Sequence, residues 1–110
     1  MRKIVLSVSR NSQVRLVRDA ALASGGFAVA PVESLQGALQ KLETLPFSAV
    51  VLGSSFSVKE KKQFMAAIEG TRRFQVISVR RRGDPASGAD IEIDGAEHHR
   101  VVGAIRRIAS

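Results

Sequence analysis

The sequence contains no cysteine, tryptophan or tyrosine, and its few aromatic residues are five phenylalanines. The absence of cysteine excludes disulfides, thiolate catalysis and cysteine-ligated zinc or iron–sulfur centres. No apolar run approaches the roughly 20 residues that a membrane-spanning helix requires. Arg2 and Lys3 precede a short apolar run that Arg10 interrupts, which does not fit a signal peptide. We therefore expect a cytoplasmic protein without membrane contact.

Acidic residues are also scarce, with 10 Asp and Glu against 17 Lys and Arg and a net charge of +7. The charge is uneven, because residues 71–82 hold five arginines and no acid, whereas residues 83–97 hold five acids and no base. A basic excess raises the question of an anionic partner such as nucleic acid. The sequence shows no helix-turn-helix pattern and no basic residues interleaved with aromatic ones. We therefore keep weak, nonspecific nucleic-acid binding only as the last of three hypotheses.

The 110 residues fit one domain, spanning 1–110, with one hydrophobic core. Short apolar runs rich in β-branched residues alternate with segments of helical spacing. The expected strands are 4–8, 27–32, 47–52, 74–79 and 91–93, and the expected helices begin at 11 or 12, 34, 57 and about 97. This alternation predicts an α/β fold, a doubly wound parallel sheet with helices on both faces.

Two of these helices carry informative patterns. The sequence from Ser57 to Glu60 fits a capping box, which satisfies backbone N–H groups at a helix start. The helix that follows should turn Phe64, Ala67 and Ile68 inward. In the first helix, we expect apolar residues on the core side and charged residues in solvent. The first group is Val14, Val17, Ala21 and Leu22, and the second is Arg15, Arg18 and Asp19.

The element order resembles the receiver domain of two-component response regulators over the whole chain. The segments that carry the resemblance are Lys-Ile-Val-Leu at 3–6, Gly-Phe-Ala-Val at 26–29, Ala-Leu at 38–39, Phe-Ser-Ala-Val-Val-Leu at 47–52 and Gly-Ala-Asp at 88–90. The resemblance implies a five-stranded, flavodoxin-like sheet in the order 2-1-3-4-5. It also implies a role in bacterial phosphorelay signal transduction.

The positions that carry the receiver's chemistry hold other residues here. The resemblance implies a phosphorylated Asp after the third strand, two Mg²⁺-binding acids after the first, a Thr or Ser after the fourth and a Lys after the fifth. The matching positions are Gly53, Ser9 with Arg10, Arg80 and Asp94, in that order. Glycine has no nucleophile, and a serine with an arginine cannot replace two anionic Mg²⁺ ligands. We interpret the chain as a degenerate pseudo-receiver.

Residues 80–89 are too few for the crossover helix that a receiver places between its fourth and fifth strands. Gly83, Pro85 and Gly88 interrupt this segment, so we expect helix 4 to be lost or reduced to one turn. Its loss should uncover an apolar face of the fourth and fifth strands, which we take as a candidate dimer or partner face. The residues of that face are Ile77, Val79, Ile91 and Ile93.

Arginines follow two of the expected strands, at the edge where ligands bind in open parallel sheets. With the serines that follow the third strand, they form a candidate site for an anion or an acidic loop of a partner. Its residues are Arg10, Ser54, Ser55, Arg80, Arg81 and Arg82. The alternative is that the arginines pair with Asp84, Asp90 and Asp94 or remain in water.

We expect no enzyme, because the sequence offers no combination of nucleophile, base and stabilising group. His98 and His99 are adjacent and complete no metal-ligand spacing, so we expect no metal and no cofactor. The leading hypothesis is a stand-alone receiver-like domain that binds a protein partner in a signalling pathway. We expect it to form a homodimer through strands 4–5 and the last helix. The second hypothesis is a sensor of an anion or nucleotide.

Overall fold

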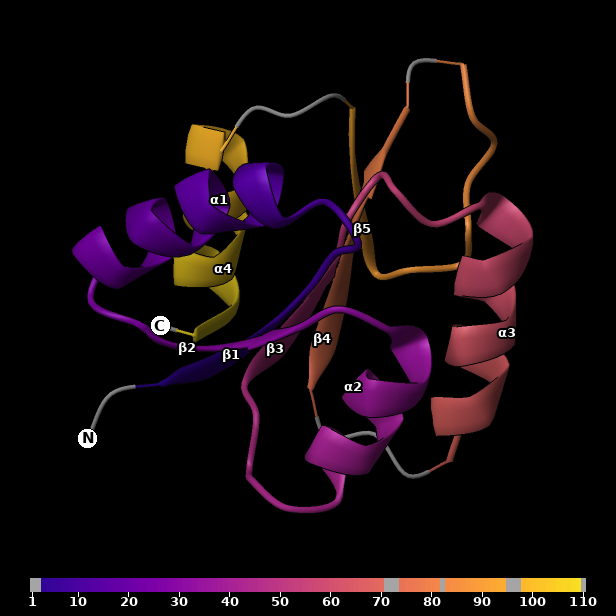
Figure 1. Ribbon diagram of the computed structural model, residues 1–110, viewed down its shortest axis with the longest axis horizontal. Coiled ribbons are helices and arrows are strands. Elements are labelled where there is room, and N and C mark those ends of the chain that lie inside the picture. Colours follow the sequence, from indigo (N-terminus) through magenta and orange to yellow (C-terminus); the bar gives the residue numbers. More distant parts are fainter. Residues whose placement is uncertain (1–2, 71–73, 82, 95–97, 110) are drawn as a thin grey trace.

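The computed structural model describes residues 3–70, 74–81, 83–94 and 98–109, which form a five-stranded sheet flanked by four helices (Figure 1). The elements are β1 (Ile4–Val8), α1 (Ser12–Ser24), β2 (Ala28–Val32), α2 (Leu35–Leu42), β3 (Ala49–Leu52), α3 (Val58–Ile68), β4 (Gln75–Arg80), β5 (Ile91–Asp94) and α4 (His98–Ala109). The alternation predicted from the sequence is confirmed. None of the helices described is long and apolar enough to cross a membrane.

All strand pairs are parallel, and the strand order is β2-β1-β3-β4-β5, as predicted. Val8 of β1 lies beside Leu52 of β3, and Leu52 lies beside Ser78 of β4. The chain leaves β1 toward one neighbour and β3 toward the other, so the sheet has its topological switch point between these two strands. The residues that follow β1 and β3 therefore meet at the carboxyl edge of the sheet.

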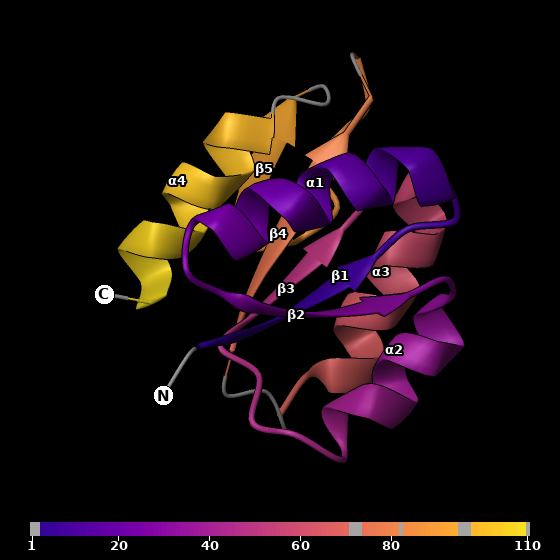
Figure 2. The same cartoon turned by 60° about the vertical axis from the view of Figure 1, so that its left-hand side comes forward.

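Helices α1 and α4 cover one face of the sheet, and α2 and α3 cover the other (Figures 1 and 2). Every residue of β3 is buried, as expected for a strand without polar alternation. Two groups of buried side chains fill the layers. One contains Val5, Leu22, Val51, Ile77, Val101 and Ile105, and the other contains Leu6, Val50, Phe56, Phe64, Ile68 and Val76.

The helix ends follow local sequence signals. The predicted capping box is present, because Glu60 N–H donates to Ser57 Oγ at 3.1 Å and Ser57 N–H donates to Glu60 Oε1 at 3.0 Å. Ser34 caps α2 by accepting from Gly37 N–H at 2.9 Å. Helix α1 ends before Gly26, whose φ of +94° favours glycine.

The connection from β4 to β5 forms no helix in its described residues, 81 and 83–90, which confirms the predicted loss of helix 4. The loop is tied to the sheet by side-chain hydrogen bonds instead. Ser87 donates to Glu92 Oε1 from its N–H at 2.6 Å and from its hydroxyl at 2.8 Å. Asp90 Oδ2 accepts from Val76 N–H at 2.7 Å.

The predicted apolar partner face on β4 and β5 is wrong. Ile77, Val79 and Ile93 are buried in the layer that contains Ile105 of α4, and Ile91 packs against the same layer. Side chains alternate along a strand, and these four point to the face that α4 covers. A right-handed crossover helix between β4 and β5 would lie on the opposite face. The strands therefore offer no exposed apolar surface for the expected dimer.

The predicted orientation of α1 is wrong in part: Leu22 is buried as predicted, but Val17 and Arg18 are exchanged. Arg18 is 2% exposed, whereas Leu16 is 62% and Val17 is 56% exposed. Arg18 donates to Ser7 Oγ from Nε at 3.2 Å and from Nη2 at 2.9 Å. The inward side of α1 thus passes through Arg18 and Leu22. The side chain of Val14 lies outside the described residues.

The inner face of α3 also differs from the prediction at one residue. Phe64 and Ile68 are buried as expected, but Ala67 is exposed and Lys61 is buried in its stead.

Candidate functional site

The carboxyl edge between β1 and β3 is tightly packed at Ser9 and Gly53. Gly53 N–H donates to the carbonyl of Val8 at 2.8 Å. A Cβ atom at residue 53 would lie 3.1 Å from both Ser9 Oγ and the Val8 carbonyl oxygen, closer than ordinary van der Waals contact. Glycine fits this close approach because it has no side chain, and any larger residue would have to displace its neighbours.

Serine side chains join the loop after β1 to the loop after β3. Ser9 is buried, and its hydroxyl accepts from Asn11 N–H at 3.1 Å and lies 3.5 Å from Ser55 Oγ. Ser55 Oγ accepts from Arg10 N–H at 3.0 Å. Ser54 is partly exposed in the same turn. Ser9 and Ser55 therefore bond to loop backbone.

Arg10 forms a two-pronged ion pair with Glu60, with Nη1 3.1 Å from Oε1 and Nη2 close to Oε2. The guanidinium carbon also lies 4.8 Å from the centre of the Phe56 ring, within the range of a cation–π contact. The hydrogen bond from Arg10 lowers the pKa of Glu60 to about 2, and the N–H of Ser57 adds to this effect. The ion pair ties the β1–α1 loop to the first turn of α3.

A second ion pair joins Arg80 and Asp94, which are neighbours in the register of β4 and β5. Arg80 Nε lies 2.5 Å from Asp94 Oδ1, and this hydrogen bond raises the pKa of Arg80. The pair lies at the same edge of the sheet as Ser9 and Gly53, because all five strands run parallel. Both ion pairs are partly open to solvent.

Comparison with known proteins gives a clear result for the fold. Searches of protein-family models and of curated proteins find no match. Among solved structures, the chemotaxis response regulator CheY4 of Vibrio cholerae matches with a TM-score of 0.83 at 16% identity, covering 98% of this chain and 99% of that one. A two-component response regulator from Clostridium difficile matches with a TM-score of 0.83 at 11% identity, covering 98% and 96%. HP1043, an orphan response regulator of H. pylori, matches with a TM-score of 0.77 at 17% identity, covering all of both chains.

The chain has the fold of a response regulator receiver domain. The matches extend over nearly its whole length, as the sequence resemblance implied.

The receiver positions named from the sequence meet at the carboxyl edge in two groups. Ser9, Arg10 and Gly53 lie where β1 and β3 end, and Arg80 pairs with Asp94 where β4 and β5 end. Because β3 lies between β1 and β4, the strand before Ser9 and Arg10 is about two strand spacings, roughly 10 Å, from the strand that carries Arg80, and the strand before Gly53 is one spacing from it.

The residues at the receiver's metal position do not fit Mg²⁺. Magnesium prefers anionic oxygen ligands in an octahedral arrangement. Here, Arg10 brings a positive charge to that position, and both oxygens of the Glu60 carboxylate face its guanidinium. No group of three or more His, Cys, Asp or Glu side chains able to hold a metal occurs in the described part of the chain.

Two of the four arginines of the candidate anion site, Arg10 and Arg80, are neutralised by these ion pairs. Arg80 pairs with Asp94, which confirms one of the pairings considered from the sequence, and Arg10 pairs with Glu60, which was not expected. Arg81 is exposed. Arg82 lies outside the described residues. The edge therefore presents less uncompensated positive charge than the sequence suggested.

Two buried cations beside this edge were missed by the sequence interpretation. Lys61 Nζ donates to Ser78 Oγ and to the carbonyl of Val79, each at 2.8 Å, and burial lowers its pKa. Arg18 reaches the end of β1 from the other face of the sheet, and burial lowers its pKa to about 10. Helical spacing places each beside a buried residue, since Lys61 precedes Phe64 by three residues and Arg18 precedes Leu22 by four, but hydropathy assigns both cations to solvent.

Proposed function

We propose that this chain is a receiver-like signalling domain that does not accept phosphate and acts through contacts with other proteins. The observation that carries the proposal is Gly53 at the phosphoacceptor position. It offers no nucleophile, and a Cβ there would lie 3.1 Å from Ser9 Oγ and the Val8 carbonyl oxygen. With Arg10 where a receiver has a metal-binding acid, neither the acceptor nor its metal site is present.

Two ion pairs fix the loops and strand ends of the carboxyl edge, a task that falls to the phosphoryl group in a phosphorylated receiver. Arg10 with Glu60 ties the loop after β1 to α3, and Arg80 with Asp94 ties the ends of β4 and β5 together. In our proposal these contacts hold the edge in one arrangement without a phosphoryl group. Binding of a partner then replaces phosphorylation as the signal, and the domain needs no enzymatic activity of its own.

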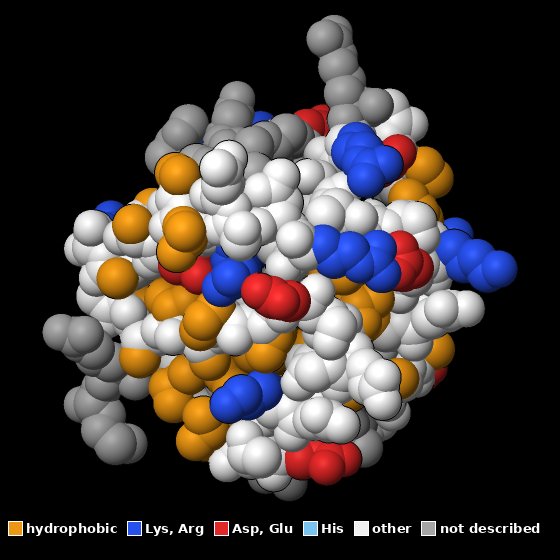
Figure 3. All heavy atoms as spheres, viewed as in Figure 1, with side chains coloured by type: hydrophobic (Ala, Val, Ile, Leu, Met, Phe, Trp, Pro, Cys, Tyr) orange, Lys and Arg blue, Asp and Glu red, His pale blue; other side chains and the backbone are white. Residues whose placement is uncertain are grey.

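The surface of α1 supports a role in protein contacts. Leu16, Val17 and Ala20 are exposed on its outer side. Figure 3 shows hydrophobic side chains gathered over α1 and, below it, over the region of the edge strand β2. Exposed apolar patches of this kind mark interaction sites in soluble proteins.

Incubation with acetyl phosphate and Mg²⁺, followed by intact-mass measurement, tests the proposal. We expect no mass increase of one phosphoryl group, while a phosphorylatable receiver treated in parallel shows it. The Gly53→Asp variant should also stay unmodified, because Ser9 and Arg10 still supply no Mg²⁺ ligand. An acid-labile or base-labile phosphoryl adduct on the wild-type chain would contradict the proposal.

A further inference from the structure

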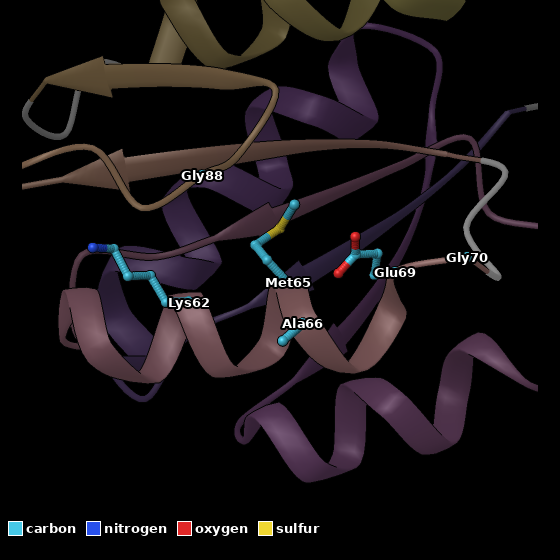
Figure 4. Close-up of a pocket in the computed structure, with 6 residues that line it drawn as sticks. All are labelled: Lys62, Met65, Ala66, Glu69, Gly70 and Gly88. Carbon is cyan, nitrogen blue, oxygen red and sulfur yellow. The ribbon is translucent and has the colours of Figure 1, made fainter.

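The missing helix leaves the flank of α3 uncovered on the side of the β4–β5 loop. A hollow of about 660 Å³ lies between the C-terminal half of α3 and this loop (Figure 4). Its lining residues are Lys62, Met65, Ala66, Glu69, Gly70 and Gly88. A second hollow, of about 590 Å³, continues along the N-terminal half of α3 and shares Lys62 and Ala66. The uncovered surface therefore extends along most of the helix.

The first hollow, which we call the α3 groove, has charges of opposite sign at its two ends. Lys62 lies at one end and Glu69 at the other, with Met65 and Ala66 between them (Figure 4). At the rise of an α-helix, seven residues correspond to about 10 Å. Both charged residues are exposed, and none of the ion pairs found among the described residues uses either one.

This pattern is complementary to itself under twofold symmetry. If two copies of α3 lie antiparallel, with the axis between Met65 and Ala66, Lys62 of each copy faces Glu69 of the other. In such an isologous interface, one surface patch supplies both sides.

We propose that a second copy of this chain occupies the α3 groove, with the two α3 helices packed antiparallel across a twofold axis. The dimer covers the flank that the lost helix leaves open, and two Lys62–Glu69 pairs set its register. A single helix face falls below the roughly 1,200–2,000 Å² that stable interfaces bury, so association is weak and concentration-dependent. The net charge of +7 on each copy makes the two copies repel one another, but salt at physiological ionic strength largely screens the repulsion between charges more than about 8 Å apart.

Sedimentation velocity of the full chain, from low micromolar to near-millimolar concentration, provides the test. The wild type should shift from monomer to dimer as concentration rises. Lys62→Glu and Glu69→Lys each place like charges opposite one another, so each should weaken dimerisation by about tenfold or more. The double variant Lys62→Glu/Glu69→Lys restores opposite charges and should dimerise within about threefold of the wild type, as expected when the two sites are coupled.

Lys41→Glu on α2 is the matched control, because it changes net charge as Lys62→Glu does but lies on another exposed helix surface. It should leave dimerisation near the wild-type level. Circular dichroism checks that every variant is folded. A wild-type chain that stays monomeric at all concentrations overturns the proposal, as does a double variant that remains as weak as the single ones. The dimer forms whether or not the carboxyl edge accepts phosphate, so this experiment and the phosphorylation assay can fail separately.

Discussion

Glu60 takes part in two interactions at once, since it closes the capping box with Ser57 and pairs with Arg10 of the β1–α1 loop. The two hydrogen-bond donors stabilise its ionised form, which is why its pKa falls to about 2. One carboxylate thus fixes a helix start and the geometry of the carboxyl edge.

The Glu60→Gln variant separates these two roles. Its amide oxygen can still accept from Ser57 N–H, so the cap is kept and only the charge is lost. We expect a loss of about 0–1 kcal/mol in the free energy of unfolding at neutral pH, because solvent screens the pair.

The pH dependence of Glu60→Gln should also change. The folded pKa of Glu60, about 2, lies below its ordinary value of 4.5, so its contribution is complete above about pH 4.5 and is lost as the pH falls toward 2. Urea unfolding across this range should show a shallower acid dependence in the variant. Equal slopes for both proteins would argue against the ion pair.

Lys61 is a second residue whose charge affects the stability of the fold. Its buried ammonium has a hydroxyl and a carbonyl as hydrogen-bond acceptors, and burial lowers its pKa, although Glu92 and Asp84 partly offset this. Lys61→Met keeps the length of the side chain but leaves Ser78 Oγ and the Val79 carbonyl without this donor. We expect a loss of about 1–3 kcal/mol in stability.

A lowered pKa also gives Lys61 a pH signature. Because the native state releases this proton before the unfolded state does, the wild type should gain stability relative to Lys61→Met as the pH rises toward 10.5. Denaturant unfolding at pH 7 and near pH 10 measures the difference. A constant difference between the two proteins would show that Lys61 has an ordinary pKa in the fold.

Among the elements, α1 departs furthest from simple amphipathic patterning. Arg15 and Asp19 lie 3.7 Å apart with their side chains largely buried, and Arg18 is buried beside Ser7. The outer side carries Leu16 and Val17. The helix thus buries Arg18 beside Leu22 on the sheet side and leaves Leu16 and Val17 in solvent.

This orientation predicts which α1 substitutions affect stability. Leu16→Gln and Val17→Gln should each change the free energy of unfolding by less than about 0.5 kcal/mol, because both side chains are exposed. Leu22→Ala should cost about 2–5 kcal/mol, because Leu22 is fully buried. Thermal unfolding of the three variants gives the comparison. A large loss in Val17→Gln would mean that the orientation is reversed.

The contrast between α1 and α3 shows what local sequence can predict. The start of α3 follows from Ser57 and Glu60, which are three residues apart and interact directly. The orientation of α1 depends on Ser7 and the carbonyl of Val8, which accept from Arg18. Hydropathy alone places arginine in solvent, and it cannot anticipate acceptors on another element.

Parts of the candidate site that depend on contacts between residues far apart in the sequence could not be predicted either. The positions at the carboxyl edge follow from strand order and were predicted, and so was the pairing of Arg80 with Asp94 as an alternative. Arg10 and Glu60 are 50 residues apart, and no local pattern relates them. Their contact depends on how the loop after β1 meets the start of α3.

At the scale of the whole molecule, the two faces of the sheet differ in cover. Helix α4 covers the α1 side of β4 and β5, whereas on the other side the described part of the β4–β5 connection is a loop that holds Ser87 and Asp90. The lost helix therefore exposes the flank of α3 and leaves the apolar residues of β4 and β5 buried. Each of the two ion pairs at the carboxyl edge is neutral, so the net charge of +7 comes from other residues.

Amide NMR spectra recorded during titration with beryllofluoride and Mg²⁺ test most directly whether this edge is closed to phosphoryl groups. Beryllofluoride mimics a phosphoryl group on an acceptor carboxylate, and in our proposal Gly53 occupies the acceptor position. We predict no saturable shift in the amide signals of Ser9, Gly53 and Ser55. Saturable, Mg²⁺-dependent shifts at these three amides would contradict the account.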